Sequence, residues 1–175
     1  MQRQDVNILK VLLNFTRLND QNTMGLRFSE TRVFRQVNMS GYIEREFDAD
    51  IEKLPEVIDF VEGELNNADV SMKNVVQISI ALEEIFVNVA HYAYTEGVGR
   101  VKVGVKVADG KISLRIEDNG VKFDPLERPD PDITLSAEER GIGGLGIFMV
   151  KKSMDEVTYS YEDGKNILTF SKNMT

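Results

Sequence analysis

The stretch ALEEIFVNVAHYAY, residues 81–94, forms the second half of the longest helical pattern in the sequence. Apolar residues recur with the spacing of one helix face at Val75, Ile78, Ala81, Ile85 and Val89. Ser71, just before this pattern, is a suitable N-cap because its hydroxyl can accept a backbone N–H of the first turn. We therefore predict a long apolar helix over residues 72–94 at the centre of the fold.

Three polar residues of this helix share one stripe. Glu84 and Asn88 are four residues apart and His91 follows three residues later, so their side chains project from the same side. The stripe could be a solvated face that carries an i,i+4 pair. It could also be a site in which a carboxylate accepts a proton, a carboxamide oxygen ligates Mg²⁺ and a histidine lies near phosphate.

The segments on either side of this helix alternate between strand and helix patterns. A strand is predicted over residues 42–47, a helix over 54–65, a hairpin over 101–116, a helix ending near 154 and a closing hairpin over 157–171. This order predicts an α+β fold, a two-layer α/β sandwich with a mixed β-sheet covered by helices on one face. We predict a poorly packed N-terminal extension over residues 1–38 and one domain over 39–175.

Asp118 follows the second strand of the first hairpin in phase with its apolar side. Ile112, Leu114 and Ile116 define that side by their period of two, so Asp118 would point toward the core. A buried carboxylate needs a hydrogen-bond donor, and the exocyclic amine of adenine would suit. Alternatively, Asp118 caps a turn with Asn119-Gly120, a common role for this sequence.

Glycines are concentrated in GIGGLG, residues 141–146, where a helix is predicted to begin. Backbone amides at a helix N-terminus attract phosphate, and glycines allow a ligand to approach closely. Arg140, with Lys151 and Lys152, could add local positive charge. The alternative is a glycine-rich hinge beside solvated cations.

Composition excludes several classes of protein. A length of 175 residues is typical of one domain. The chain has no cysteine and one histidine, which excludes disulfides and multi-histidine metal clusters. A net charge of −8 argues against direct nucleic-acid binding. No apolar run approaches the roughly 20 residues that cross a bilayer, so we expect no membrane association and a cytoplasmic location.

Taken in order, these segments resemble the GHKL, or Bergerat-fold, ATPases over about residues 42–172. ALEEIFVN at residues 81–88 resembles the N-box, DNGVKFDP at 118–125 the first glycine box, and GLG at 144–146 the second. Within that superfamily, the sequences FDP at 123–125, AY at 93–94 and MDEV at 154–157 resemble the anti-sigma-factor serine kinases. The resemblance implies a histidine-kinase-like ATP-binding domain with ATP and Mg²⁺ as cofactors.

The resemblance also implies roles for individual residues. Glu84 would be the general base, Asn88 the Mg²⁺ ligand and Asp118 the partner of the adenine amine, with Gly120 giving the base room. Asn166 occupies the place where many relatives have a threonine near the adenine. The remaining predicted nucleotide contacts are His91, Arg140, Gly143, Gly144, Leu145 and Gly146.

Two functions follow from this resemblance. The first is a serine/threonine protein kinase that binds a sigma factor and phosphorylates a serine of an anti-anti-sigma (STAS-type) protein. The second is a nucleotide-gated binding module that sequesters a sigma factor or another regulator with little or no catalysis. A homodimer is implied by the resemblance in either case.

Overall fold

The computed structural model describes residues 38–127, 129–131 and 145–174. The predicted extension over residues 1–38 therefore lies, apart from Asn38, outside the described residues. The elements run in the order β1 (Ile43–Asp48), η1 (Ile51–Lys53), α2 (Leu54–Asn67), α3 (Met72–Tyr92), β2 (Arg100–Ala108), β3 (Lys111–Asp118), η2 (Pro125–Glu127), α4 (Leu145–Ser153), β4 (Glu156–Glu162) and β5 (Lys165–Asn173).

The described strands form one sheet in the order β1-β2-β3-β5-β4, and every pairing between neighbours is antiparallel. The expectation of a mixed sheet was wrong in this respect. β3 and β4 do run in the same direction, since each is antiparallel to β5. However, β5 lies between them, so the two parallel strands, joined through α4, never pair.

Both predicted hairpins are present, and their turns have the expected chemistry. The turn between β2 and β3 contains Asp109 and Gly110 with φ of 53° and 72°, and the turn between β4 and β5 contains Asp163 and Gly164 with φ of 51° and 77°. Two successive residues with positive φ form the tight turn whose twist matches that of paired strands, and aspartate and glycine are among the residues that tolerate it.

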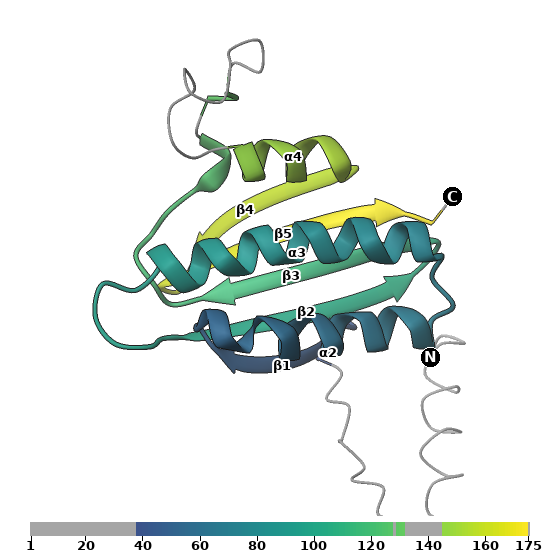
Figure 1. Ribbon diagram of the computed structural model, residues 1–175, viewed down its shortest axis with the longest axis horizontal. Helices are drawn as coiled ribbons and strands as arrows, with labels where there is room; N and C mark the ends of the chain where they lie inside the picture. Colours follow the sequence, from purple (N-terminus) through teal and green to yellow (C-terminus); the bar gives the residue numbers. More distant parts are fainter. Residues whose placement is uncertain (1–37, 128, 132–144, 175) are drawn as a thin grey trace, which may run out of the picture. The chain divides into compact units, whose positions relative to one another are not determined.

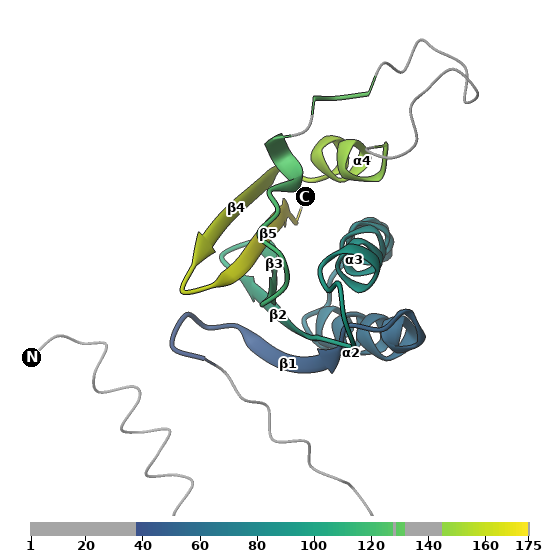
Figure 2. The ribbon, with the colours of Figure 1, turned by 90° about the vertical axis from the view of Figure 1, so that its left-hand side faces the viewer.

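The helices α2, α3 and α4 cover one face of the sheet, as Figures 1 and 2 show from two directions. This arrangement confirms the predicted two-layer α+β sandwich. The core lies between the layers, and its fully buried side chains include Val57, Val61, Leu65, Ile78, Leu82, Phe86, Val101, Val103, Ile112, Leu114, Ile116 and Phe170. Burial of each large apolar side chain contributes roughly 1.5–3 kcal/mol, so this layer supplies most of the driving force for folding.

Helix α3 begins as the sequence predicts and ends slightly earlier. Ser71 is its N-cap, and the Ser71 hydroxyl accepts a hydrogen bond from the backbone N–H of Asn74. The helix extends to Tyr92, and Ala93 at its C-cap donates to the carbonyl of Val89. The residues after it turn toward β2, which positions the C-terminal part of α3 beside the end of β3.

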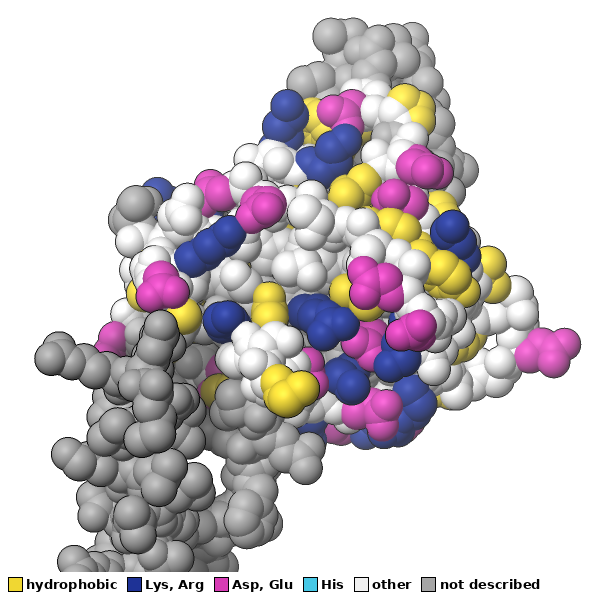
Figure 3. All heavy atoms as spheres, turned by 180° about the vertical axis from the view of Figure 1, so that it is seen from behind, with side chains coloured by type: hydrophobic (Ala, Val, Ile, Leu, Met, Phe, Trp, Pro, Cys, Tyr) yellow, Lys and Arg dark blue, Asp and Glu magenta, His cyan; other side chains and the backbone are white. Residues whose placement is uncertain are grey.

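The face of the sheet away from the helices is polar (Figure 3). Charged side chains of both signs lie there and form ion pairs, among them Arg100 with Glu46 and Lys165 with Glu117. Such pairs keep an open sheet face solvated and contribute little stability individually. Within the described part of the chain, no helix is both long and apolar enough to span a membrane.

Candidate functional site

A cavity of about 660 Å³ opens between α3, the N-terminus of α4 and the segment that follows β3. Its walls are mostly apolar, and a few polar groups converge in it, which is typical of a small-molecule site. The residues that line it are Glu84, Ile85, Asn88, Val89, Tyr92, Ala93, Ile116, Asp118, Val121, Lys122, Phe123, Pro125, Leu145, Gly146, Ile147, Tyr159, Asn166 and Leu168. Six predicted site residues meet here: Glu84, Asn88, Asp118, Leu145, Gly146 and Asn166.

Asp118 is buried at the end of β3, with 6% of its surface exposed. Its Oδ1 accepts hydrogen bonds from the backbone N–H of Gly120 at 2.8 Å and from Nδ2 of Asn166 at 2.9 Å. Burial raises the pKa of the Asp118 carboxyl above its ordinary value, while these two hydrogen bonds act in the opposite direction. Among the described residues no group donates to Oδ2, so this oxygen can accept from a ligand in the cavity.

Asn166 fixes the position of Asp118 and of the segment after it. Its Nδ2 donates to Asp118 Oδ1 and, at 3.1 Å, to the carbonyl of Val121. Its Oδ1 accepts from the hydroxyl of Tyr159 at 2.7 Å and from the backbone N–H of Phe123 at 3.1 Å. The side-chain amide thereby makes four hydrogen bonds, a full complement for an asparagine in a buried place.

Tyr159 is a member of the site that the sequence analysis missed. It lines the cavity and orients the amide of Asn166 through its hydroxyl. Burial is the main cause that raises the pKa of the Tyr159 hydroxyl, so this group stays a hydrogen-bond donor at neutral pH. The available signal was its phase in β4, where Tyr159 lies directly opposite Leu168 of β5.

Glu84 and Asn88 face each other on the cavity side of α3. Nδ2 of Asn88 donates to Oε1 of Glu84 at 2.8 Å and to the carbonyl of Glu84 at 2.7 Å. With Nδ2 turned this way, Oδ1 of Asn88 accepts no hydrogen bond from the described residues. The stripe predicted from the sequence therefore presents a carboxylate and a carboxamide oxygen, both hard oxygen donors.

The first turn of α4 lies directly against Glu84. A Cβ built on Gly146 would lie 1.8 Å from Cδ of the Glu84 carboxyl group. Only a glycine allows the backbone to approach this carboxyl so closely. The N-terminal turn of α4, which favours negative charge, thus shares the cavity with the predicted catalytic glutamate.

Gly120 does not line the cavity but supports the turn that follows Asp118. A Cβ on Gly120 would lie 2.3 Å from the backbone oxygen of Ala93. The neighbouring Val121 donates its N–H to that oxygen at 2.7 Å. The turn is therefore packed tightly onto the C-terminal end of α3.

Of the four remaining predicted contacts, only His91 is described by the structure. His91 is exposed on α3, with its ring 5.9 Å from that of Tyr92, and it is absent from the cavity lining. Arg140, Gly143 and Gly144 lie outside the described residues. Their contacts with a nucleotide stay predictions.

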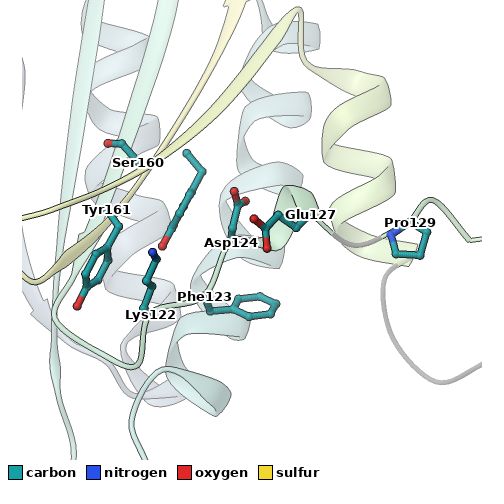
Figure 4. Close-up of a pocket in the computed structure, with 8 residues that line it drawn as sticks. Lys122, Phe123, Asp124, Glu127, Pro129, Ser160 and Tyr161 are labelled. Atoms are coloured by element: carbon teal, nitrogen blue, oxygen red, sulfur yellow. The ribbon is translucent and has the colours of Figure 1, made fainter.

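A second cleft, of about 650 Å³, adjoins the cavity and shares Lys122, Phe123 and Tyr159 with it (Figure 4). Lys122 lies over the ring of Tyr161, with Nζ 5.1 Å from the ring centroid. None of the predicted site residues lines this cleft. The first cavity, where a buried carboxylate and the Glu84–Asn88 pair converge, is therefore the candidate site.

The side chains of the cavity fit ATP and Mg²⁺. Asp118 Oδ2 offers an acceptor for an amine within apolar walls, as an adenine base requires. No cluster of three or more acidic, histidine or cysteine side chains occurs in the described residues, so a full protein cage for a metal is absent there. Mg²⁺ in nucleotide sites needs only one or two protein oxygens, because phosphates and waters complete its shell. Oδ1 of Asn88, which accepts no hydrogen bond from the described residues, can supply one of them.

The sandwich and its cavity define a nucleotide-binding domain of the ATPase type. The chain belongs to the histidine kinase-like ATPase domain family, whose model matches residues 47–172. Membership of this family implies the use of ATP.

Two relatives of the chain belong to a narrower class of protein, the serine-protein kinases. The chain is 30% identical to the serine-protein kinase RsbW of Listeria monocytogenes serovar 1/2a over 111 residues, which cover 61% of this chain and 71% of that protein. It is 26% identical over 110 residues to the serine-protein kinase RsbW of Bacillus thuringiensis, covering 61% and 69% of the two chains.

A solved structure has the same fold. The crystal structure of the RsbU and RsbW domains of Rv1364c from Mycobacterium tuberculosis superposes with a TM-score of 0.54 at 17% identity. The match covers 75% of this chain and 32% of the Mycobacterium chain, so the present chain spans about a third of that longer protein. At this identity the likeness shows the fold alone.

Proposed function

We propose that this protein is an ATP-dependent serine/threonine kinase that acts as an anti-sigma regulatory factor in the cytoplasm. The observation that carries the proposal is the convergence, in one cavity, of Asp118 from β3, the Glu84–Asn88 pair from α3 and Gly146 from α4. These groups fit the base, the metal-bound phosphates and the attacking hydroxyl of a phosphoryl transfer. The kinase names of the RsbW relatives support the same chemistry.

ATP would bind with its base at Asp118 and its phosphates at the α4 end of the cavity. Asp118 Oδ2 accepts from the adenine amine, and the apolar side chains of Ile116 and Leu168 enclose the ring. Asn88 Oδ1 would hold Mg²⁺, and the ion would neutralise phosphate charge during transfer of the γ-phosphoryl group. The backbone amides at the start of α4 hold the phosphate oxygens.

Glu84 would act on the acceptor serine. Its carboxylate, oriented by Asn88 Nδ2, takes the proton of the serine hydroxyl as the serine oxygen bonds to the γ-phosphorus. The bond between the γ-phosphorus and the bridging oxygen breaks, and ADP leaves. Positioning of the two reactants contributes most of the rate, as in other phosphoryl transfers.

The acceptor is a serine of an anti-anti-sigma, STAS-type partner, and the sequestered regulator is a sigma factor. The RsbW relatives are named serine-protein kinases, which supports a serine acceptor. The STAS-type partner and the sigma factor follow from the resemblance of the motifs at residues 93–94, 123–125 and 154–157 to the anti-sigma-factor serine kinases. Nucleotide occupancy would then set which partner is bound, since a ligand shifts an equilibrium by its differential affinity for two states. We propose in addition that the protein forms a homodimer, as its resemblance to the anti-sigma-factor serine kinases implies.

Replacement of the proposed base tests the catalytic part. We expect Glu84→Gln to lower phosphate transfer from γ-labelled ATP to purified STAS-domain proteins of the same organism roughly 100-fold or more, because general-base catalysis contributes about 10²–10⁴-fold. ATP affinity should change little. Glu83→Gln is the matched control, since Glu83 is exposed on the same helix and absent from the cavity lining.

The same assay separates the kinase from a nucleotide-gated binding module. Transfer that is equal in Glu84→Gln and the wild type would refute the role of Glu84 as base. ATP binding and nucleotide-dependent partner binding without transfer to any STAS protein would refute the kinase and favour the binding module.

A further inference from the structure

The end of α3 holds the turn after Asp118 at three points. The carbonyl of Ala93 accepts from the N–H of Val121 at 2.7 Å, and the backbone of Gly120 packs against Ala93. The third contact is a hydrogen bond of 3.2 Å from the N–H of Asn119 to the hydroxyl oxygen of Tyr94. The residues before and after Gly120 are therefore both anchored to the dipeptide Ala93-Tyr94.

The same hydroxyl also reaches β2. Tyr94 donates its O–H to the carbonyl of Arg100 at 2.5 Å. Arg100 precedes Val101, and Val101 pairs directly with Asp118 in the sheet. The hydroxyl of Tyr94 therefore links Arg100 of β2 to Asn119 in the turn after β3.

The ring of Tyr94 is held in place by close packing. A Cβ on Gly99 would lie 2.0 Å from Cζ of the ring, so the ring is in close contact with the Gly99 backbone. The carbonyl of Gly99 in turn accepts from the N–H of Ala49 at 2.8 Å, beside the end of β1. The contact with Gly99 restricts the ring, and the two hydrogen bonds restrict its hydroxyl.

Tyr94 is absent from the cavity lining, so any effect on a ligand passes through the turn. Gly120 donates its N–H to Oδ1 of Asp118, and Asn119 and Val121 on either side of it are the anchored residues. Fixing these two residues fixes the Gly120 N–H, which orients the Asp118 carboxyl group. The orientation of the carboxyl group sets the position of Oδ2, which as a carboxylate oxygen can accept a hydrogen bond but cannot donate one.

We propose that Tyr94 is a positioning residue that sets the preference of the site for a base with an exocyclic amine over a base with a carbonyl at the same position. The proposal rests on the proposed nucleotide function. An amine of the base can donate a hydrogen bond to Oδ2 of Asp118. A carbonyl oxygen at the same position cannot, because it and Oδ2 are both acceptors. The discrimination depends on the angle of the carboxyl group, and Tyr94 maintains that angle.

The test compares ATP with inosine triphosphate, which has a carbonyl in place of the amine, in titrations of Tyr94→Phe with Mg²⁺ present. Phenylalanine keeps the ring on Gly99 and removes both hydrogen bonds. We expect the Kd for ATP to rise roughly 5-fold, which corresponds to the net free energy of one hydrogen bond, that between Asp118 and the adenine amine. The Kd for inosine triphosphate should change less. Tyr42→Phe is the control, because no described residue hydrogen-bonds the hydroxyl of Tyr42.

An equal loss of affinity for both nucleotides, or no loss, would overturn the proposal. The ratio of the two affinities is measured within one folded variant, so a change in stability alone does not alter it. A second readout needs no nucleotide. Amide hydrogen exchange of Asn119 should become several-fold faster in Tyr94→Phe than in the wild type.

The two readouts separate failure of this inference from failure of the proposed function. A wild type that binds neither nucleotide refutes the proposed function, and with it the role in base selection. Unchanged exchange at Asn119 refutes the anchoring by Tyr94, whatever the wild type binds. A narrowed ATP preference together with faster exchange supports the inference.

Discussion

At the residue scale, the two oxygens of Asp118 have different environments. Oδ1 accepts hydrogen bonds from Gly120 and Asn166, whereas Oδ2 accepts none from the described residues, and Asp118 lines the cavity. Because burial raises the pKa of this carboxyl group, the ionised form is less favourable in the folded protein than in the unfolded chain. Ionised Asp118 therefore lowers stability at neutral pH, which agrees with the proposal that the carboxylate serves ligand binding.

Gly120 gives a prediction about stability. Gly120→Ala should lower the free energy of unfolding by about 2 kcal/mol or more, since the new Cβ would lie 2.3 Å from the Ala93 oxygen and the turn must shift. Gly63→Ala in α2 is the matched control. No atom lies within 4 Å of a Cβ there, so this change should stabilise the protein by roughly 0.5–1 kcal/mol. Urea unfolding measures the free energy of unfolding of both variants. Similar values for the two would show that the contact between Gly120 and Ala93 leaves room for a methyl group.

Several residue assignments could be made from the sequence because their signals are local. Ser71 precedes an apolar helix, and Asp118 continues a period of two. The phase of Tyr159 in β4 indicates that its side chain lies on the same side of the sheet as Leu168, but no local pattern predicts the hydrogen bonds that Tyr94 and Tyr159 make. Tyr94 joins Asn119 25 residues further along the chain, and Tyr159 acts on Asn166 across a hairpin, so both roles appear only once the chain has folded.

At the element scale, the hairpins and the sandwich were predictable, whereas the strand order was not. β2–β3 and β4–β5 pair across two-residue turns, so the sequence beside each turn encodes the pairing. The insertion of β5 between β3 and β4 depends on contacts between residues about 50 positions apart, such as Asp118 with Asn166. No local pattern carries that information.

Three cations on the open sheet face surround Glu117. Lys165 lies 2.7 Å, Arg115 3.0 Å and Lys102 3.7 Å from its carboxylate. Burial alone would raise the pKa of Glu117, but the hydrogen bond from Lys165 and the charges of all three cations outweigh it and lower the pKa. A carboxyl group with a lowered pKa stabilises the fold above its unfolded pKa and loses this contribution as the pH falls through its folded pKa.

We therefore expect Glu117→Gln to reduce stability at pH 7 by roughly 0.5–1 kcal/mol, a modest value because solvent screens the site. The difference from the wild type should shrink as the pH falls below about 4.5, the ordinary value for this group. Urea unfolding at pH 7, 5 and 3.5 measures it, with Glu96→Gln, at an exposed loop position, as the control. A difference that is constant with pH would refute the electrostatic explanation.

At the scale of the whole molecule, the two faces differ in chemistry. The helical face holds the candidate site, between α3 and α4, and the open face of the sheet carries paired charges (Figure 3). Because the net charge is −8, the proposed phosphate binding would depend on local hydrogen-bond donors and a metal ion. Family membership over residues 47–172 and the kinship with RsbW kinases agree with a nucleotide site on the helical face.

The central claim is that this cavity binds Mg-ATP through Asp118 and Asn88. The most direct test is isothermal titration calorimetry of ATP with Mg²⁺ into the wild type, Asp118→Asn and Asn88→Ala. We predict micromolar to millimolar binding by the wild type and affinity at least about 10-fold weaker in each variant, since each loses a hydrogen bond or ligand to a charged group. Asp118→Asn keeps the shape and should stay folded. No wild-type binding, confirmed by a second method, or undiminished binding by both variants would contradict the claim.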